Sequence, residues 1–237
     1  PVVPPEMTVL RLRHGRPNET ELRNITKSLF IPIGFLGEGA QADEINLSWR
    51  DTNGERWSYH GSDRRVEYWR ISTSTKTFKE AKSASSLALG FMGDHGLDLK
   101  KFSAPSVKSN KVNFYALQDG LEIKNPDGSS MLYAELTINE TRQQVMHALL
   151  TLPLDPDRSD YETLSVRQAT QLMASGGLGG TPPGEVTINR TNIAWTLVED
   201  KEIWPVKRYL IPALIGTGVV VRDGATEPYV IVVPLTK

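Results

Sequence analysis

The sequence contains no cysteine among its 237 residues. This absence excludes disulfide bonds, cysteine nucleophiles and metal sites with thiolate ligands. It is compatible with an extracytoplasmic bacterial protein, although cytosolic proteins can lack cysteine too.

The sequence also lacks an excess of charge of either sign. It has 27 Lys and Arg against 28 Asp and Glu, for a formal net charge of −1. General nucleic-acid binders carry a basic excess, so we expect no nucleic-acid partner. No apolar run of about 18 residues is present, which is the length that a membrane-spanning helix needs. The hydrophobic content of 39% is sufficient for a folded core.

The opening residues, "PVVPPEMTV", contain Pro1, Pro4 and Pro5. This composition predicts a stiff, extended tether over residues 1–7, of the kind that follows a signal or anchor helix. We therefore expect a membrane anchor before this sequence in the native protein. An arbitrary boundary is the alternative.

The first segment, 8–73, has the pattern of a strand, a helix and a meander. The apolar–charged alternation of "TVLRLR" (8–13) predicts a strand, and Leu22, Ile25 and Leu29 lie on one face of a helix expected at 18–31. A meander of two or three strands is expected after it, from the segments 45–51, 56–61 and 65–72, with a hairpin turn at Asn53-Gly54.

The second segment, 74–153, repeats the plan. A helix is expected from residue 74 to about Met92, closed by Gly93 or Gly96. "KVNFYALQDGLEI" (111–123) predicts a strand with a bend near Asp119-Gly120, "NPDG" (125–128) a turn, and 129–140 the returning strand. Residues 141–153 fit either a third strand or a helix.

The third segment, 164–237, begins with a helix at 164–176 that Ser165 can cap. Residues 185–199 predict a strand pair or one long bent strand. Further strands are expected at 204–221 and 228–236, with Pro205 and Pro212 at edges or bulges. A linker is expected near 153–164, where the sequence reads "PLDPDRSDYET".

The three segments together predict an α+β fold. It contains about three helix-plus-antiparallel-meander units, and each helix packs on one face of an antiparallel sheet. Units of about 70 residues bury only a marginal core alone, so we expect one compact body or two loosely joined ones.

The glycine-rich stretch "ASGGLGGTPPGE" (174–185) raises the possibility of a phosphate loop. Such a loop follows a strand and precedes a helix, so that backbone N–H groups point at the anion. Here the expected helix comes first, and no Gly-Lys-Ser/Thr is present. We interpret the stretch as a connector in which Gly176 or Gly177 ends the helix in the left-handed conformation.

The second and third segments resemble a known group of proteins. The helix "FKEAKSASSLALGFMGDHGLD", then "VNFYALQDGLEI" and "MLYAELTINE", resembles PepSY-like domains and the extracytoplasmic regions of YycH/YycI-type regulatory proteins and related bacterial lipoproteins. The order "LSVRQATQLMASG", "INRTNIAWTLVED", "KRYLIPALIGTG" and "YVIVVPL" is similar to the closing unit of those proteins. The resemblance covers about residues 70–237 and implies PepSY-like units at 74–153 and 164–237. It also implies a membrane-tethered regulator that performs no catalysis and supplies no catalytic residues.

The polar residues form no established metal-binding or catalytic motif. The four histidines show no metal-ligand spacing, and His95 between Asp94 and Asp98 is better interpreted as a helix C-cap. No Gly-x-Ser-x-Gly is present, although a Ser/His/Asp set could assemble in space. Calcium could use Asp155, Asp157 and Asp160, but the EF-hand spacing is missing. We predict no catalytic residue, no metal and no cofactor.

Two groups of residues are candidates for contact with a partner. A local basic excess between Arg70 and Lys111 could face an anionic polymer, lipid or acidic partner, or could be a solvated helix face. Aromatic residues of the meander, with Trp57 and Tyr59 on one strand face, are expected to pack in the core. The partner-binding residues that we predict are Lys79, Lys82, Lys100, Lys101, Trp204 and Tyr209.

These observations favour a non-catalytic, extracytoplasmic regulatory domain of a bacterial envelope protein. It would bind a protein partner in the membrane or envelope through a sheet edge or the concave face of a sheet. A peptide- or glycan-binding envelope lipoprotein is the alternative, and an enzyme of unknown type is the third.

Overall fold

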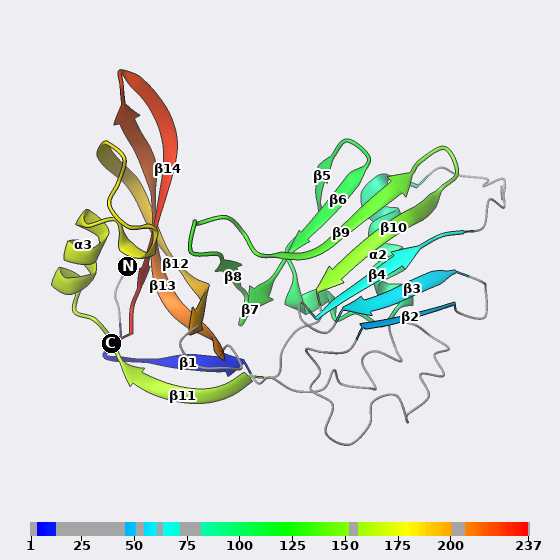
Figure 1. The fold of residues 1–237 in the computed structure, drawn as a ribbon, viewed down its shortest axis with the longest axis horizontal. Helices are drawn as coiled ribbons and strands as arrows, with labels where there is room; N and C mark the ends of the chain where they lie inside the picture. The colour runs from blue at the N-terminus through cyan, green and yellow to red at the C-terminus, as the bar shows by residue number, and fades with distance from the viewer. Residues whose placement is uncertain are drawn as a thin grey trace. The chain divides into compact units, whose positions relative to one another are not determined.

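The computed structural model describes residues 4–12, 46–50, 55–60, 64–71, 82–151, 156–200 and 207–236. These residues form mainly β-strands, arranged in two sheets, with two α-helices (Figure 1). The chain divides into two compact units. Unit 1 contains β1, β7, β8, β11 to β14 and α3, and unit 2 contains β2 to β6, β9, β10 and α2. No helix in the described part of the chain has the length and apolar content needed to cross a membrane.

Unit 2 contains one antiparallel sheet of seven strands, in the order β2-β3-β4-β10-β9-β6-β5. Its strands are β2 (Asn46–Arg50), β3 (Arg56–His60), β4 (Arg65–Trp69), β5 (Ser106–Lys108), β6 (Lys111–Tyr115), β9 (Leu132–Asn139) and β10 (Gln144–Thr151). The predicted pairing of the first two strands is confirmed, with Trp49 opposite Trp57. The turn residues Asn53 and Gly54 lie outside the described part.

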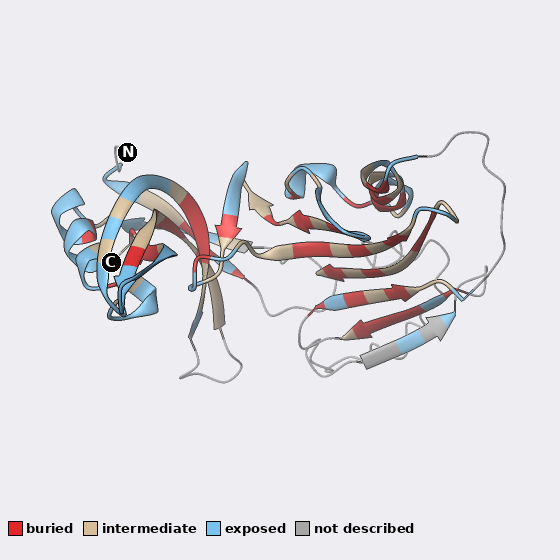
Figure 2. Cartoon of the chain, turned by 90° about the horizontal axis from the view of Figure 1, so that it is seen from above, coloured by how far each residue is buried: buried red, intermediate tan, exposed pale blue. Residues whose placement is uncertain are grey.

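Helix α2 (Ala84–Asp94) covers one face of this sheet and contacts β5, β6, β9 and β10. It begins after Ser83, whose side chain accepts a hydrogen bond from the N–H of Ser86. His95 is its C-cap, as predicted. Trp57 and Tyr59 are both fully buried, which confirms that alternation places them in the core. Figure 2 shows buried residues recurring along the strands of the sheet.

Tyr68 lies in this core, where its ring contacts Trp57 and Phe91. Burial raises the pKa of its phenol above the ordinary value, and the charge of Arg70 opposes the shift only in part. Above about pH 10 the unfolded chain releases this proton and the folded chain keeps it, so we expect the free energy of unfolding to fall as pH rises. Urea denaturation of wild-type protein and Tyr68→Phe between pH 8 and 11 measures this effect.

The Tyr68→Phe variant should lose less stability than wild type over that range. Tyr161→Phe is the matched control for the chemical change, because Tyr161 is 44% exposed and lies outside this core. Equal slopes for wild type and Tyr68→Phe would contradict the assignment of the alkaline loss to this phenol.

Unit 1 contains the second sheet, in the order β11-β1-β13-β12-β8-β7, with β14 also paired to β13. Its strands are β1 (Glu6–Leu12), β7 (Leu117–Gln118), β8 (Leu121–Lys124), β11 (Pro156–Glu162), β12 (Glu185–Asp200), β13 (Lys207–Arg222) and β14 (Ala225–Pro234). The long hairpin of β12 and β13 is the centre of the sheet. Strand β8 runs parallel to β12 and pairs with it only at Trp195 and Thr196.

Pro212 lies where two strands share one edge of β13. Strand β1 pairs with β13 as far as Leu210, and β14 begins its pairing at Ala213. Proline has no N–H to donate, so it fits the interval between these two partners. Its carbonyl oxygen accepts a hydrogen bond from the N–H of Leu235, at 2.8 Å. The proline therefore occurs at an interruption of the ladder, as such residues usually do.

Helix α3 (Val166–Ala174) contacts β14. Ser165 caps it in a capping box with Gln168, in agreement with the predicted cap. Gly176 follows with φ of 97°, the left-handed conformation expected at the end of the helix. A 3-10 helix, η4 (Gly177–Gly179), then contacts β14. The glycine-rich stretch is therefore a connector between α3 and β12.

The predicted fold class, α+β with about three helix-plus-meander units, is wrong. The described residues contain two α-helices, and their two sheets combine strands from different segments. Strand β1, from the first segment, pairs with β11 and β13, whereas β4 of the same segment pairs with β10. Hydrophobic periodicity locates a strand but does not specify its partner, because the ladder joins backbone groups. The helix expected at 18–31 lies outside the described residues.

Three local predictions are also resolved. Residues 141–153, which fitted either state, contain the strand β10. The single bent strand expected at 111–123 is three strands, β6, β7 and β8. Asp119 and Gly120, where the bend was expected, both have positive φ and form a tight turn between β7 and β8. The polar stretch expected to be a linker contains β11, which pairs with β1 along its length. Its polar side chains suit a strand at the end of a sheet.

Candidate functional site

A pocket of about 180 Å³ lies in unit 1 and is lined by residues of five strands and one turn. The lining residues are Met7, Thr8, Asp119, Leu121, Arg158, Ile193, Ala194, Trp195 and Pro212. We call it the Trp195 pocket. Trp195 lies directly opposite Pro212 in the β12–β13 ladder, and Ile193, two residues earlier, projects from the same face of the sheet.

The sheet curls around this pocket. Strands β11 and β7 are the two ends of the sheet order. Even so, Arg158 Nη2 on β11 lies 3.7 Å from Asp119 Oδ1 in the β7–β8 turn. Both side chains are more than half exposed, so this ion pair contributes little to stability. It does balance the two charges at the pocket, so the paired side chains contribute no net charge there.

Trp195, one of the lining residues, has a buried indole N–H. The side chain is 7% exposed, and its Nε1 atom is buried with no hydrogen-bond acceptor in the part of the chain that the structure describes. A buried donor without an acceptor costs about 1–3 kcal/mol. Thr8, also in the pocket, donates its hydroxyl proton to Asp160 at 2.8 Å, so the Thr8 oxygen keeps only acceptor capacity.

Strand β12 also has a free edge beside this pocket. Its other edge pairs with β13 from Glu185 to Asp200, but on this side β8 pairs only with Trp195 and Thr196. Residues 185–192, excepting the half-buried Val186 and Ile188, are exposed. Within the described residues, this stretch of β12 therefore has an edge with no strand paired to it.

A second cluster of functional groups lies on unit 2, on the sheet face opposite α2. Glu67 approaches two histidines: its Oε1 lies 2.9 Å from His147 Nε2, and its Oε2 lies 3.8 Å from His60 Nε2. Ser58 Oγ lies 3.2 Å from the same nitrogen of His60. A Ser-His-acid triad needs the serine and the acid on different ring nitrogens. This arrangement therefore does not build an activated serine.

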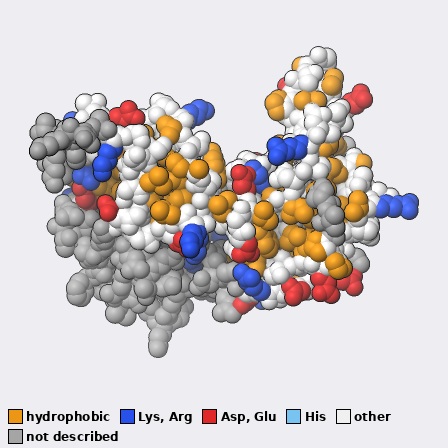
Figure 3. All heavy atoms as spheres, turned by 180° about the vertical axis from the view of Figure 1, so that it is seen from behind, with side chains coloured by type: hydrophobic (Ala, Val, Ile, Leu, Met, Phe, Trp, Pro, Cys, Tyr) orange, Lys and Arg blue, Asp and Glu red, His pale blue; other side chains and the backbone are white. Residues whose placement is uncertain are grey.

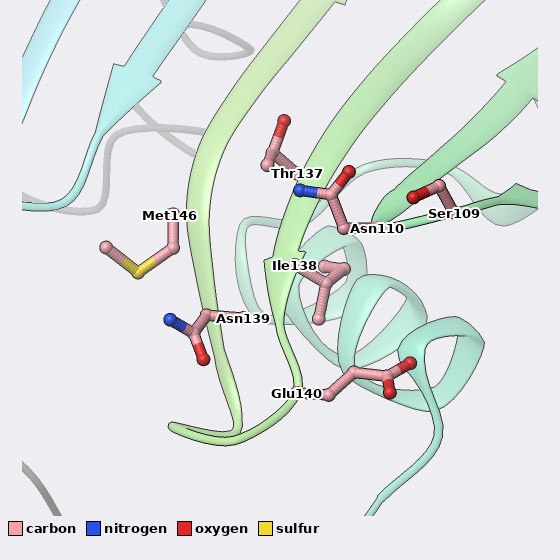
Figure 4. A pocket seen from close by; sticks show the side chains of 7 residues that line it. All are labelled: Ser109, Asn110, Thr137, Ile138, Asn139, Glu140 and Met146. Carbon is pink, nitrogen blue, oxygen red and sulfur yellow. The ribbon is translucent and has the colours of Figure 1, made fainter.

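A third candidate is a hollow of about 370 Å³ at the ends of two hairpins in unit 2 (Figure 4). Figure 4 shows Asn139 and Met146 on one side of the β9–β10 hairpin and Glu140 on the other. Asn139 accepts a hydrogen bond from the N–H of Arg142, and the Asn110 carbonyl accepts one from Ile138. These polar groups stabilise the turns and leave no convergent set for a ligand.

The predicted partner-binding residues belong to different parts of the chain. Lys82, Lys100 and Lys101 are exposed residues of unit 2, and Tyr209 is a half-buried residue of unit 1. Lys79 and Trp204 lie outside the described residues. Among the described residues on the face drawn in Figure 3, the Lys and Arg side chains are spread over the surface and form no large basic patch. A partner-binding role for these six residues stays a prediction.

The residues that the sequence offered as possible metal ligands make other contacts in the structure. The ring of His95 packs against Trp57 and Phe91, and Asp98 caps the 3-10 helix η3 (Leu99–Lys101). Asp160 accepts the Thr8 hydroxyl, and Asp155 lies outside the described part. No group of three or more His, Asp or Glu among the described residues is placed to hold a metal ion.

Nothing in the sequence marks Trp195 as a functional residue. Its position in an apolar alternation is the same as that of a core tryptophan, so the sequence carries no signal of its unpaired N–H. Two of its neighbours in the pocket, Met7 and Thr8, lie on β1, and Arg158 lies on β11. These two strands are more than 140 residues apart in the sequence. Only pairing of these strands in one sheet brings them to Trp195.

No family model and no curated protein matches this chain. Several solved structures are similar to it. A protein from Eubacterium rectale has a TM-score of 0.46 and 8% identity over 97% of this chain and 82% of its own. The C-terminal domain of YpeB from Bacillus megaterium has a TM-score of 0.30 and 12% identity over 91% and 99%. YycH from Bacillus subtilis has a TM-score of 0.34 and 13% identity over 73% and 41%.

The predicted resemblance to YycH-type proteins is confirmed to this extent, because YycH is among the similar structures. Similarity of this degree says nothing of function.

Proposed function

We propose that this chain is a non-catalytic interaction domain of a regulatory, membrane-tethered, extracytoplasmic bacterial protein. It binds a protein partner in the envelope by adding a strand of the partner to the free edge of β12. The observation that carries the proposal is the exposed edge of β12, which has no paired strand among the described residues. The extracytoplasmic location rests on the sequence alone, which has no cysteine and resembles extracytoplasmic proteins.

The register supports this interpretation of the edge. The carbonyl of Pro212 bonds with Leu235, on the side of β13 away from β12. In an antiparallel ladder, Trp195 opposite Pro212 must then direct its own N–H and C=O away from β13, where β8 lies. Ile193 and Thr191 follow at intervals of two residues, so their N–H and C=O groups face the same edge. β8 pairs with neither of them.

The length of the available edge is limited by a bulge. The β12–β13 register shifts between Ile188 and Arg190, which leaves Asn189 as the extra residue. Bulges twist a strand edge and protect it from indiscriminate pairing. The regular part of the free edge therefore begins at Arg190 and ends where β8 starts to pair. A short edge of this kind suits a short extended segment of a partner, with specificity supplied by neighbouring side chains.

Thr191→Pro tests the edge directly. Proline removes the outward N–H and adds bulk on the free edge, while the β13 ladder keeps its bonds, since Thr191 directs none toward β13. Thr191→Val is the matched control, because it removes the hydroxyl and keeps the N–H. One main-chain hydrogen bond contributes about 0.5–1.5 kcal/mol, and steric exclusion adds to it, so recovery of the partner should fall about tenfold or more.

The measurement is quantitative affinity capture from a bacterial envelope extract with wild type and both variants, each first shown to have the wild-type circular dichroism spectrum. A protein recovered by wild type and Thr191→Val but lost with Thr191→Pro supports strand addition. Equal recovery by all three would refute it. Binding only to an oligosaccharide array, with no protein recovered, would instead favour the glycan-binding alternative.

A further inference from the structure

We infer that the segment of the partner that pairs with β12 alternates apolar and polar residues and carries a carboxylate beside Arg190. The occupant of the free edge is then an extended segment with an acidic residue between two apolar ones. This inference deepens the proposed function and rests on it, because it takes the occupant of the edge to be a strand. Two observations select the pattern: the faces of β12 differ in polarity, and the cation at its edge has no partner.

The face of β12 on the side of α3 is apolar. Ile188 and Ile193 are half-buried and pack against the buried cluster that α3 shares with β14. Thr191 lies on the same face, two residues before Ile193, and an added Cβ on Gly216, opposite Thr191, would lie 3.1 Å from Met173 of α3. A side chain opposite Thr191 in an added strand therefore lies beside the two isoleucines. An apolar side chain there removes their exposed surface from water.

The other face of this stretch is polar. Arg190 and Asn192 are exposed, and they alternate with the residues of the α3 face, so their side chains project away from α3. Ala194 continues this face and belongs to the buried cluster that contains Ile215. A residue directly opposite Arg190 in an added strand has its Cβ about 4.5–5.5 Å from the Cβ of Arg190. The side chains opposite this face therefore meet polar groups and solvent.

Arg190 gives the polar face a positive charge. Its side chain forms no ion pair with any residue that the structure describes, whereas Arg158, Arg208 and Arg222 of unit 1 lie 3.7, 3.0 and 3.5 Å from a carboxylate oxygen. A carboxylate in the added strand supplies the missing partner. A lysine at the same position would be repelled, because like charges directly opposite each other destabilise a pair of strands.

A charged side chain on a free edge can have another role, which is to prevent pairing. The two roles differ in their consequences. An arginine that only blocks the edge weakens the binding of every added strand. An arginine that binds a carboxylate strengthens the binding of acidic strands and weakens that of basic ones. Substitution of Arg190 therefore distinguishes the two roles.

The test uses blocked seven-residue peptides that begin and end with valine, with threonine at every second position. The central threonine is replaced by glutamate, glutamine or lysine. A fourth peptide has the composition of the glutamate peptide but places its valines next to each other, so it lacks the alternation. Binding is followed through the amide signals of Thr191 and Ile193 in the ¹⁵N-labelled chain, because these N–H groups face the free edge.

We expect the glutamate peptide to bind about two- to fivefold more tightly than the glutamine peptide, which is the range for one exposed ion pair. It should bind about fivefold or more tightly than the lysine peptide, because attraction and repulsion add. The rearranged peptide should bind more weakly than the glutamate peptide. Sodium chloride at about 1 M should reduce the preference for glutamate, because salt screens exposed charges.

Arg190→Glu should reverse the order, so that the lysine peptide binds more tightly than the glutamate peptide. Arg222→Glu is the matched control and should keep the wild-type order. Arg222 is an exposed arginine of the neighbouring strand β13, one residue beyond the last pair of the β12–β13 ladder. Both variants are first shown to have the wild-type circular dichroism spectrum.

Equal binding of the glutamate, glutamine and lysine peptides to the wild type would overturn the inference. Tighter binding of all three peptides to Arg190→Ala than to the wild type would also overturn it, because the arginine would then only block the edge. The same conclusion follows if no peptide moves the Thr191 and Ile193 signals.

The capture experiment with Thr191→Pro separates this inference from the proposed function. If Thr191→Pro loses the partner while the charge of the peptide has no effect, strand addition stands and the acidic pattern is wrong. If the peptides bind in the expected order while partner recovery is the same for Thr191→Pro and wild type, the edge selects acidic strands and the partner binds elsewhere.

Discussion

Replacing Trp57 by alanine should lower the free energy of unfolding of unit 2 by about 3–5 kcal/mol, the range for large aromatic residues removed from a core. Trp57 is fully buried, and its ring centroid lies 4.7 Å from that of Tyr68 and 5.1 Å from that of His95. No neighbouring side chain can fill the resulting space without leaving its own packing. Urea denaturation followed by far-ultraviolet circular dichroism measures the loss.

Trp69→Ala is the matched control for this prediction. Trp69 lies on the adjacent strand β4, projects from the opposite face of the same sheet and is only partly buried. Its indole contacts Arg56 and His147, which are partly exposed themselves. Trp69→Ala should therefore lower the free energy of unfolding clearly less than Trp57→Ala does. A larger loss for Trp69→Ala would contradict the placement of the core on the α2 side of the sheet.

Replacing Gly177 by alanine should destabilise unit 1 by about 2–5 kcal/mol. Its φ of +59° already costs an L-residue about 1–2 kcal/mol. An added Cβ would also lie 2.2 Å from the carbonyl oxygen of Val232 in β14, so the connector or the strand must shift. Overpacking of this kind costs about 1–3 kcal/mol more. Native-state hydrogen exchange of the β14 amides measures this loss of stability in the strand that Gly177 contacts.

Gly224→Ala separates the two contributions, because Gly224, in the turn between β13 and β14, also has a positive φ, +80°, but an added Cβ there meets no atom within 4 Å. This substitution should lower the free energy of unfolding only by the conformational contribution, about 1–2 kcal/mol. If both variants lower the free energy of unfolding by the same amount, the close approach of Gly177 to β14 does not affect stability. The glycine-rich stretch would then be a loose connector and not a packed one.

The glycine variants also test whether the stability of unit 1 and its binding of a partner depend on different parts of the sheet. Helix α3 and η4 both contact β14, whereas the edge of β12 proposed for binding has no strand paired to it among the described residues. Loss of packing at Gly177 should therefore lower stability without removing the edge at Thr191. Partner binding by Gly177→Ala, measured at a temperature where the variant is folded, should stay within about threefold of wild type, since sites without shared contacts act nearly additively.

Several features of the fold were predictable because they depend on neighbours in the sequence. Ser165 with Gln168 three residues later specifies a helix start, since both reach the same backbone donors. Asn125 and Gly128 form the predicted turn, closed by a hydrogen bond from the N–H of Gly128 to the carbonyl of Asn125. Alternation placed Trp57 in the core because successive side chains of a strand point to opposite faces.

Other features depend on residues far apart and were not predictable. The sequence indicated most strands of the described residues but assigned them to three local sheets, whereas β1 pairs with β11 and β13, some 150 and 200 residues away. Backbone groups are alike at every residue, so the ladder carries no partner information in the side chains. The stretch 156–162 looked like a linker because only its pairing with β1 makes it a strand.

The sequence by itself thus determined the helix caps, the turns, the faces of the strands and the absence of cysteine chemistry. The tertiary structure alone decided which strands meet, where β12 remains unpaired, and that Thr8, Arg158 and Trp195 line one pocket. The physical reason is the range of the forces involved. Caps, turns and alternation act over two to four residues, whereas the site is assembled by pairing across the whole chain.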